Sequence, residues 1–242
     1  EYAHDLNSFT YRIGGVEIGA TLQSFKTFNN DGVLEHKLPR YRWNWLKRAC
    51  SNWQYNDYTN FWGLVDVMNL PNNEIDAAIA ETVNVKAFTG AIAVNQFIGN
   101  YDSYGTRRGK NMYLYGGDGY LWTLLAWDMD ISFTQDTSLT LTQPINPLDS
   151  GFPNHDPVIW AFLKRPWITR EFWRQVIKIA KGAASDSIEM QEAVERNAAL
   201  RADGCNLNTF TAVADKIATR TASVNSQIAA LNAPRFALTS PV

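Results

Sequence analysis

The chain has 242 residues, of which 45% are hydrophobic and 13% aromatic, which is enough apolar material to form a core without metal ions or disulfides. Its 22 Lys and Arg residues nearly balance its 24 Asp and Glu residues, and a net charge of −2 is not typical of a general nucleic-acid-binding protein. Because the apolar runs are much shorter than the roughly 20 residues that a membrane span needs, we expect no membrane span.

The first 38 residues are expected to be rich in β-strand. The stretch TYRIGGVEIGATL alternates around Gly14 and Gly15, and Asp31-Gly32 is a typical hairpin turn. We interpret residues 1–38 as a remnant of a preceding lobe or a connector, and residues 39–242 as one compact domain.

From about residue 40 the pattern becomes helical. One helical stripe is formed by Phe61, Leu64, Val65 and Met68. After Pro71 a second helix is expected to begin, with Asn72 or Asn73 as its N-cap. Residues 85–99 are apolar on nearly all sides, which predicts a buried helix.

The periodicity changes again over residues 111–133, where two apolar runs flank the turn sequence GGDG and predict a β-hairpin. Residues 134–156 are typical of a loop. Helices are predicted in 156–165, 167–182, 187–202 and 208–231. The fold class is therefore α+β and mainly α, with a small β-hairpin in the middle of the domain.

The run LLAWDMDISF (124–133) places two carboxylates at the end of an apolar strand. If the strand continued, Asp128 and Asp130 would share a face with Leu124 and Ala126, and their repulsion would need a cation, a basic side chain or a shared proton. Oxygen ligands of this kind suit Mg²⁺ or Ca²⁺. If the strand ended at Trp127, both acids would be solvated.

A second stretch, GNYDSYGTRRGKNMYLY (99–115), gives these acids a context. A buried helix followed by Asp102, then Asn111 at the start of a hairpin and Asp128 at its end, is the order found in protein kinases. There, an Asp accepts the proton of the acceptor hydroxyl, and Asn and Asp hold the metal ion. The basic residues between them, Arg107, Arg108 and Lys110, either neutralise phosphates or form a solvated loop.

These stretches resemble the spore-coat protein H (CotH) kinase family, a family of secreted atypical kinases, over roughly residues 38–235. The motifs that carry the resemblance are FIGNYDSYG, GKNMYLY and LLAWDMDISF. The resemblance implies the C-terminal lobe of a kinase-like fold, with ATP and Mg²⁺ or Mn²⁺ as cofactors and Ser or Thr of extracytoplasmic proteins as acceptors. It implies Asp102 as the base, Asn111 and Asp128 as metal ligands, and Asp130 as an auxiliary ligand or a structural acid.

The resemblance also implies a secreted or cell-surface protein, whose partner is a protein substrate or a neighbouring surface-layer protein. An oxidising compartment would favour a disulfide between the two cysteines, Cys50 and Cys205, although two buried thiols fit the count equally well. The sequence begins with Glu1 rather than Met, and we expect a processed product or part of a longer chain.

The sequence departs from the kinase pattern in two places. Asn111 follows Asp102 by nine positions, whereas the kinase motif has its Asn five positions after the Asp, and the four extra residues TRRG (106–109) are expected to bulge outward. The phosphate-covering loop and the Lys–Glu pair of an N-terminal lobe are not recognisable, so we expect little or no ATP turnover by this chain alone.

Three other interpretations fit parts of the sequence. The run LLAWDMDIS is similar to the start of a haloacid dehalogenase, but the helical sequence after it does not suit that fold. An EF-hand fails because Phe133 and Leu139 stand where Gly and Glu are required. A non-catalytic module with a structural or adhesive role remains open, with Trp43, Trp45, Trp53 and Trp62 as candidates for contacts, although most of these are expected in the core.

Overall fold

The structure is a computed structural model that describes residues 2–4, 11–13, 16–18, 20–47, 56–100, 103–106, 109–117, 119–129, 132–133, 144–149, 156–182, 184, 188–207 and 211–231. Within these residues the fold is mainly helical. The helices are α1 (Leu38–Asn44), α2 (Thr59–Met68), α3 (Ile75–Thr82), α4 (Val85–Phe97), α6 (Pro157–Leu163), α7 (Pro166–Lys181), α8 (Ile188–Ala202) and α9 (Thr211–Leu231). The strands are β1 (Tyr2–His4), β2 (Tyr11–Ile13), β3 (Val16–Ile18), β4 (Lys26–Phe28), β5 (Leu34–His36), β6 (Leu46–Lys47), β7 (Met112–Gly117) and β8 (Tyr120–Ala126).

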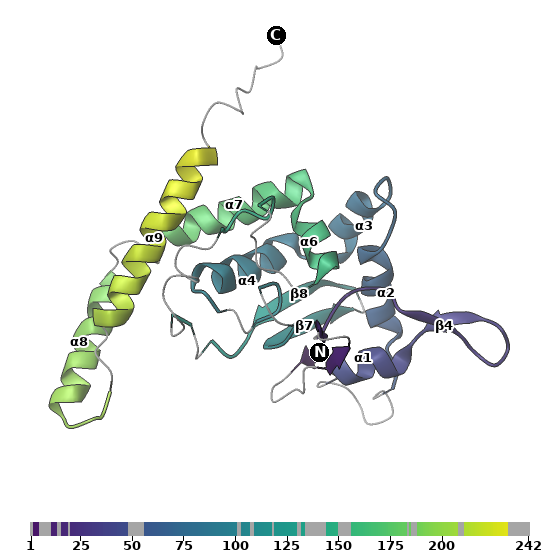
Figure 1. Cartoon of the computed structure of the whole chain (residues 1–242), viewed down its shortest axis with the longest axis horizontal. Helices are drawn as coiled ribbons and strands as arrows, with labels where there is room; N and C mark the ends of the chain where they lie inside the picture. The colour runs from purple at the N-terminus through teal and green to yellow at the C-terminus, as the bar shows by residue number, and fades with distance from the viewer. Residues whose placement is uncertain are drawn as a thin grey trace, which may run out of the picture.

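Helix α4 lies at the centre of the molecule, between α7 on one side and the β7–β8 hairpin on the other (Figure 1). Its buried apolar side chains are Phe88, Ile92, Ala93 and Phe97, and Thr89, Asn95 and Gln96 are buried as well. This burial confirms the helix predicted for this stretch, which ends at Phe97 rather than at residue 99. Its first turn is capped by Asn84, whose Oδ1 accepts from the Ala87 amide over 3.1 Å.

The predicted hairpin is confirmed as β7 and β8, which pair antiparallel from Met112↔Ala126 to Gly117↔Tyr120. The sheet has the order β6-β1-β7-β8, so β1 pairs with β7 and joins the N-terminal segment to the hairpin. Strands β4 and β5 form a separate hairpin, and Gly32 takes the left-handed φ of +75° that its turn needs. This hairpin confirms the turn expected at Asp31-Gly32.

The helix α2 buries Phe61, Leu64, Val65 and Met68, which is the stripe that the sequence predicts. Around them lies an aromatic cluster in which Trp45 is fully buried and contacts Phe61 and Tyr104. The N-cap predicted for α3 is wrong, because the helix begins at Ile75 and Glu74 precedes it without a side-chain capping bond.

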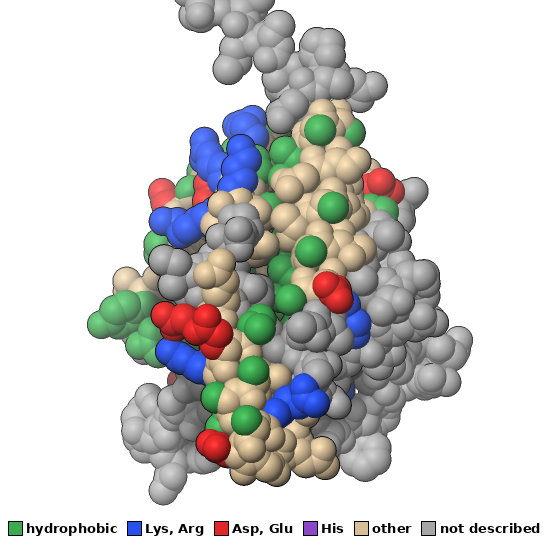
Figure 2. Space-filling view, turned by 90° about the vertical axis from the view of Figure 1, so that its left-hand side faces the viewer, with side chains coloured by type: hydrophobic (Ala, Val, Ile, Leu, Met, Phe, Trp, Pro, Cys, Tyr) green, Lys and Arg blue, Asp and Glu red, His purple; other side chains and the backbone are tan. Residues whose placement is uncertain are grey.

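The long helices α8 and α9 form one end of the molecule, and α9 packs against α7 (Figure 1). Residues Val224 and Ile228 of α9 are buried. Figure 2 views this end, where Lys and Arg side chains gather beside the upper part of α9. None of the helices in the described part of the chain is both long and apolar enough to cross a membrane.

Candidate functional site

The predicted site residues divide into two groups. Asp102, Arg107, Arg108 and Asp130 lie outside the described residues. Lys110, Asn111 and Asp128 are described, and they lie at the open end of the β7–β8 hairpin, next to the C-terminal end of α4. The described part of the site therefore consists of the hairpin end and the residues that hold it against α4.

At the last pair of the hairpin ladder, Met112↔Ala126, Asn111 directly precedes Met112 and Asp128 follows Ala126 by two residues. Both have a φ of 55°, in the left-handed region that Asn and Asp tolerate better than other side chains that carry a Cβ. Strand β8 ends at Ala126, so the alternation of side chains does not reach Asp128. Of the two alternatives that the sequence left open, a continued strand is therefore excluded, and the strand ends one residue before the Trp127 end considered there.

Among the described residues, three buried oxygens around this hairpin end lie without a hydrogen-bond partner: Asn111 Oδ1, Asn100 Oδ1 and Ser132 Oγ. Asn111 itself is 2% exposed. A buried oxygen that accepts nothing costs about 1–3 kcal/mol, so a fold that retains it usually gives it a water or an ion. Neutral amide oxygens and carboxylate oxygens are both ligands that Mg²⁺ or Mn²⁺ accepts.

Asn100 joins the end of α4 to Asp128. Gly99 has a φ of 66°, and the Asn100 amide donates to the Asn95 carbonyl over 2.9 Å, which ends the helix in a Schellman motif. The Asn100 Nδ2 donates to Asn95 Oδ1 over 3.1 Å and to the Asp128 carbonyl over 3.3 Å. Asn100 therefore fixes the backbone two residues before Asp102 beside the backbone of Asp128.

The loop after Asp102 folds back onto α4. Ser103 Oγ and Thr106 Oγ1 donate to the Asn100 carbonyl over 2.7 and 2.8 Å. Gly105 has a φ of 78°, and a Cβ there would lie 2.8 Å from the Ile92 side chain, so glycine is required. These contacts hold the described part of the loop, residues 103–106, in one compact form.

The expectation that TRRG bulges outward is wrong at both ends of that segment. Thr106 is 2% exposed, and Gly109 is buried as well. The Gly109 carbonyl accepts from the Ala20 amide over 2.8 Å. The physical reason is that the backbone groups of a buried loop need partners, and residues 20–22 supply one here.

Asp156 ties the same loop to the N-terminal segment and to α6. Its Oδ2 accepts from the Tyr104 hydroxyl and from the Leu22 amide, both over 2.8 Å, and its Oδ1 caps α6 at the Val158 amide over 3.0 Å. Burial, together with the neighbouring Asp156 carboxylate, raises the pKa of the Tyr104 hydroxyl well above its usual value, so this hydroxyl stays a donor. The sequence signalled the cap, since Asp-Pro precedes a helical pattern, but not the two distant partners.

Arg220 of α9 holds the other side of the α4 terminus. This side chain is 1% exposed, and its Nη2 and Nε donate to the carbonyls of Gln96 and Phe97 over 3.0 and 3.2 Å. Burial lowers the pKa of Arg220 to about 10, so it is still a cation at neutral pH and opposes the negative end of the helix dipole. Arg220 is not among the residues predicted from the sequence. Its position four residues before the buried Val224, on the same face of the helix, is the signal that could have indicated it.

A second contact from α9 reaches the segment that follows Asp128. The Lys216 Nζ donates to the Phe133 carbonyl, and the Phe133 amide donates to the Ile98 carbonyl over 3.1 Å. Helix α9 therefore braces both chain segments that carry the predicted site residues, the one that leads to Asp102 and the one that follows Asp128.

Two further predicted residues have definite surroundings. Lys110 is half-buried, and its carbonyl accepts from the Tyr104 amide over 2.7 Å. Cys205 is exposed and is a free cysteine, while Cys50 lies outside the described residues. The predicted disulfide is therefore not present in the structure: the thiol of Cys205, in the exposed segment after α8, is free.

Among the described residues, no group of three or more His, Cys, Asp or Glu side chains is close enough to hold a metal ion. Two of the predicted carboxylates, Asp102 and Asp130, lie outside the described part of the chain. Asn side chains can also contribute an oxygen to a hard cation. The described metal-ligand candidates are thus Asn111, with its unpaired oxygen, and Asp128.

Comparison with known proteins agrees with the motifs. The family model "CotH kinase protein" matches residues 26–203, which is most of the chain and includes the loop after α4, the β7–β8 hairpin and α7. The chain belongs to the CotH kinase family. The match begins at β4 rather than at residue 38, and it ends before α9, which braces the site. No curated protein and no solved structure matches the chain significantly.

Proposed function

We propose that this chain carries the catalytic and metal-binding residues of a CotH-type kinase that transfers the γ-phosphate of ATP to Ser or Thr hydroxyls of extracytoplasmic proteins, and that it turns over little or no ATP without the N-terminal lobe of such a kinase. The observation that supports the proposal best is the buried, unpaired Oδ1 of Asn111, held at a left-handed backbone position beside the end of the strand that precedes Asp128. The family membership and the order Asp102, Asn111, Asp128 support the same assignment.

In this proposal Asn111 Oδ1 and the Asp128 carboxylate would hold Mg²⁺ or Mn²⁺, with Asp130 as an auxiliary ligand. The metal ion, when bound with ATP, would neutralise the charge that develops on the phosphate oxygens. The carboxylate of Asp102 accepts the proton of the acceptor hydroxyl while the oxygen of that hydroxyl forms a bond to the γ-phosphorus. The bond between the γ-phosphorus and the oxygen that bridges the β- and γ-phosphates breaks, which releases ADP.

The remaining groups of the site orient these residues. Asn100 and Arg220 fix the end of α4 and thereby the start of the Asp102 loop. Lys110, with Arg107 and Arg108, would contribute positive charge near the phosphates, as in the phosphate clamps of other phosphotransferases.

The proposal is tested by phosphoryl transfer from radiolabelled ATP to a Ser- and Thr-rich acceptor such as dephosphorylated casein, with Mg²⁺ or Mn²⁺. The assay is run on this chain and on the full-length natural protein, with Asp102→Asn, Asp128→Asn and, as a control, Asp31→Asn in the exposed β4–β5 turn. We expect little or no transfer by this chain alone. In the full-length protein we expect the first two substitutions to lower the rate by about 10²-fold or more, and the control to leave it unchanged. Equal rates in all variants, or no transfer by either protein, would reject the kinase assignment.

The alternative function, a non-catalytic structural or adhesive module, is favoured by one specific observation. The outward face of the β7–β8 hairpin exposes Tyr115 and Trp127 by 50% each and Leu125 by 45%. Exposed apolar faces of this kind are typical of contact surfaces. Two of the tryptophans that were candidates for adhesive contacts are not available for them. Trp45 is fully buried, and Trp62 is partly buried and packs against the core. Trp53 and the Trp43 side chain lie outside the described residues.

A further inference from the structure

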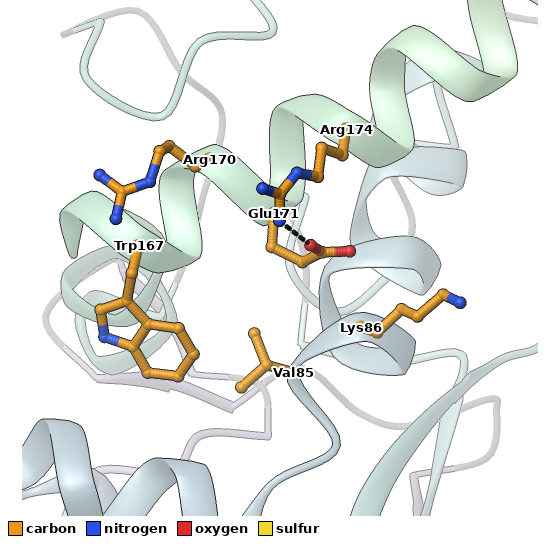
Figure 3. Close-up of a pocket in the computed structure, with 6 residues that line it drawn as sticks. All are labelled: Val85, Lys86, Trp167, Arg170, Glu171 and Arg174. Carbon is orange, nitrogen blue, oxygen red and sulfur yellow. Dashed lines mark hydrogen bonds and ion pairs between the residues drawn. The ribbon is translucent and has the colours of Figure 1, made fainter. Parts of the chain in front are cut away.

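A groove lies between the N-terminal ends of α4 and α7, away from the hairpin end that forms the candidate site (Figure 3). It has a volume of about 340 Å³ and is lined by Val85, Lys86, Trp167, Arg170, Glu171 and Arg174. The indole of Trp167 and the side chain of Val85 face one another in the groove. The side chains of Arg170, Glu171 and Arg174 lie along α7 beside them, and the Lys86 side chain extends outward from the start of α4 (Figure 3). The groove thus combines an apolar wall with a charged rim.

The rim is mainly positive. Lys86, Arg170 and Arg174 contribute three cations against one carboxylate, that of Glu171. This carboxylate already accepts from Arg174 over 3.0 Å and from Gln175 over 2.6 Å. Within the described part of the chain, neither Lys86 nor Arg170 forms an ion pair. Two exposed cations are therefore available to an anionic ligand.

The positive charge continues along α7. Arg170, Arg174 and Lys178 are exposed at intervals of four residues, so they follow one face of the helix in steps of about 6 Å. In an extended peptide every second side chain lies on the same side, in steps of about 6.6 Å. A segment with an acidic residue at every second position therefore matches the spacing of these cations.

The apolar wall is rigid. Trp167 Nε1 donates to Asp76 Oδ1 over 2.8 Å, and the same carboxylate accepts from Arg165 Nε. These bonds fix the indole ring against α3 in the absence of a ligand, so binding does not have to order it. The indole ring and Val85 offer a contact for one aliphatic or aromatic side chain of a peptide. The phosphate backbone of a nucleic acid would not use this apolar contact.

Helix α4 runs from Val85 at the groove to Phe97, which is about 18 Å at a rise of about 1.5 Å per residue, and the candidate site lies just beyond that end, so the groove and the site are about 20 Å apart. About seven residues of extended peptide span this distance. A segment bound in the groove would therefore place a Ser or Thr at the candidate site only if the two lie seven or more residues apart in the substrate.

We propose that the groove docks an acidic, extended segment with one apolar anchor from the protein substrate. The identification of the partner as the substrate rests on the proposed kinase function. The docking itself rests on charge complementarity, on the match of spacing along α7 and on the fixed apolar wall. Electrostatic contacts of this kind raise the association rate and are weakened by salt.

The test is fluorescence anisotropy with a labelled nonapeptide of alternating Glu and Ser that carries one central Leu, measured without ATP or metal. The variant Arg170→Glu/Lys178→Glu is compared with a control of equal charge change, Arg196→Glu/Arg201→Glu on α8. We expect the groove variant to raise Kd at least tenfold and the control less than twofold. Circular dichroism melting curves check that both variants are folded.

Two changes of the probe test the chemistry of the ligand. Replacing the central Leu of the peptide by Ser should raise Kd at least threefold, and raising NaCl from 50 to 300 mM should raise it further. A single-stranded oligonucleotide of the same charge and vesicles with anionic lipid should bind less tightly. Tighter binding of either, an equal loss in the groove and control variants, or no binding of the peptide at millimolar concentration would overturn the proposal.

The same samples separate this proposal from the proposed function. Docking is measured without nucleotide, so a chain that transfers no phosphate still tests it. If phosphoryl transfer fails and the groove variant loses the peptide, the kinase function is rejected and docking stands. If transfer occurs equally well to acceptors with and without the acidic segment, docking as a substrate determinant is rejected.

Discussion

The guanidinium of Arg220 lies against the last turn of α4 and donates to the carbonyl of Gln96, a residue 124 positions earlier in the chain, over 3.0 Å. Arg220 belongs to α9, which the family match does not cover, whereas Gln96 lies in the helix that leads to the candidate site. Two carbonyls of the last turn of α4, those of Gln96 and Phe97, therefore have their donor on a helix outside the range of the family match.

Replacing Arg220 by Met should lower the free energy of unfolding by about 2 kcal/mol. Hydrogen bonds from a charged donor contribute about 1.5–3 kcal/mol each. The substitution also removes the desolvation cost of a buried cation, which offsets part of this loss. Urea denaturation measures the change. Arg201→Met, at an exposed position of α8, is the control and should change stability by less than about 0.5 kcal/mol. A neutral result for Arg220→Met would show that the contact is not stabilising.

Asp128→Asn should lower the affinity for Mn²⁺ at least tenfold, because the substitution removes the anionic ligand of the proposed site. Asn tolerates the φ of 55° at this position as well as Asp does, so the backbone is preserved. Free Mn²⁺ is measured by electron paramagnetic resonance during titration. Asp149→Asn, at an exposed position, serves as the control. Unchanged binding by the Asp128 variant would remove this residue from the ligand set.

Tyr104→Phe should destabilise the protein by about 1.5–3 kcal/mol, since it deletes a buried hydrogen bond to the Asp156 carboxylate. Tyr115→Phe is the matched control, because Tyr115 is 50% exposed and its substitution should be nearly neutral. Thermal and urea unfolding of both variants check the difference. Equal effects would mean that the Tyr104 hydroxyl makes no net contribution.

The contribution of Asp76 to stability should disappear in acid. The Arg165 guanidinium, and then the Trp167 indole N–H, hold the pKa of this carboxyl below its usual value. Because the folded pKa is the lower one, the unfolded chain binds more protons, and the stabilisation is present above about pH 4 and is lost as the pH falls through the folded pKa. The group is half exposed, so we expect less than about 1 kcal/mol.

The measurement is the stability difference between the wild type and Asp76→Asn from pH 7 to pH 2.5. This difference should be constant down to about pH 4 and shrink below it. A difference that grows in acid would contradict the assigned direction of the shift.

Cys205 should react with iodoacetamide in the native protein, because it is exposed and free. Mass spectrometry of the native sample should locate the label in the segment after α8. The denatured, non-reduced sample should take up two labels, one on each cysteine. If the denatured, non-reduced protein takes up no label, the predicted disulfide between the two cysteines would be supported instead.

Much of the fold could be predicted from the sequence because it depends on local periodicity. The stripe of α2, the all-round apolar α4 and the β7–β8 hairpin each follow from side chains within about 15 residues of one another, where the periods of 3.6 and 2 apply. The family could be recognised for the same reason, since its motifs are short and lie in order.

The tertiary structure alone decided how the candidate site is held. The left-handed backbone at Asp128 ends the alternation that the strand pattern implied, and the Asp156 bond to the Leu22 amide joins residues 134 positions apart. Arg220 similarly reaches across 124 positions to Gln96. No local pattern encodes such partners, because they are selected by which buried backbone groups are left without a donor or an acceptor once the helices have packed.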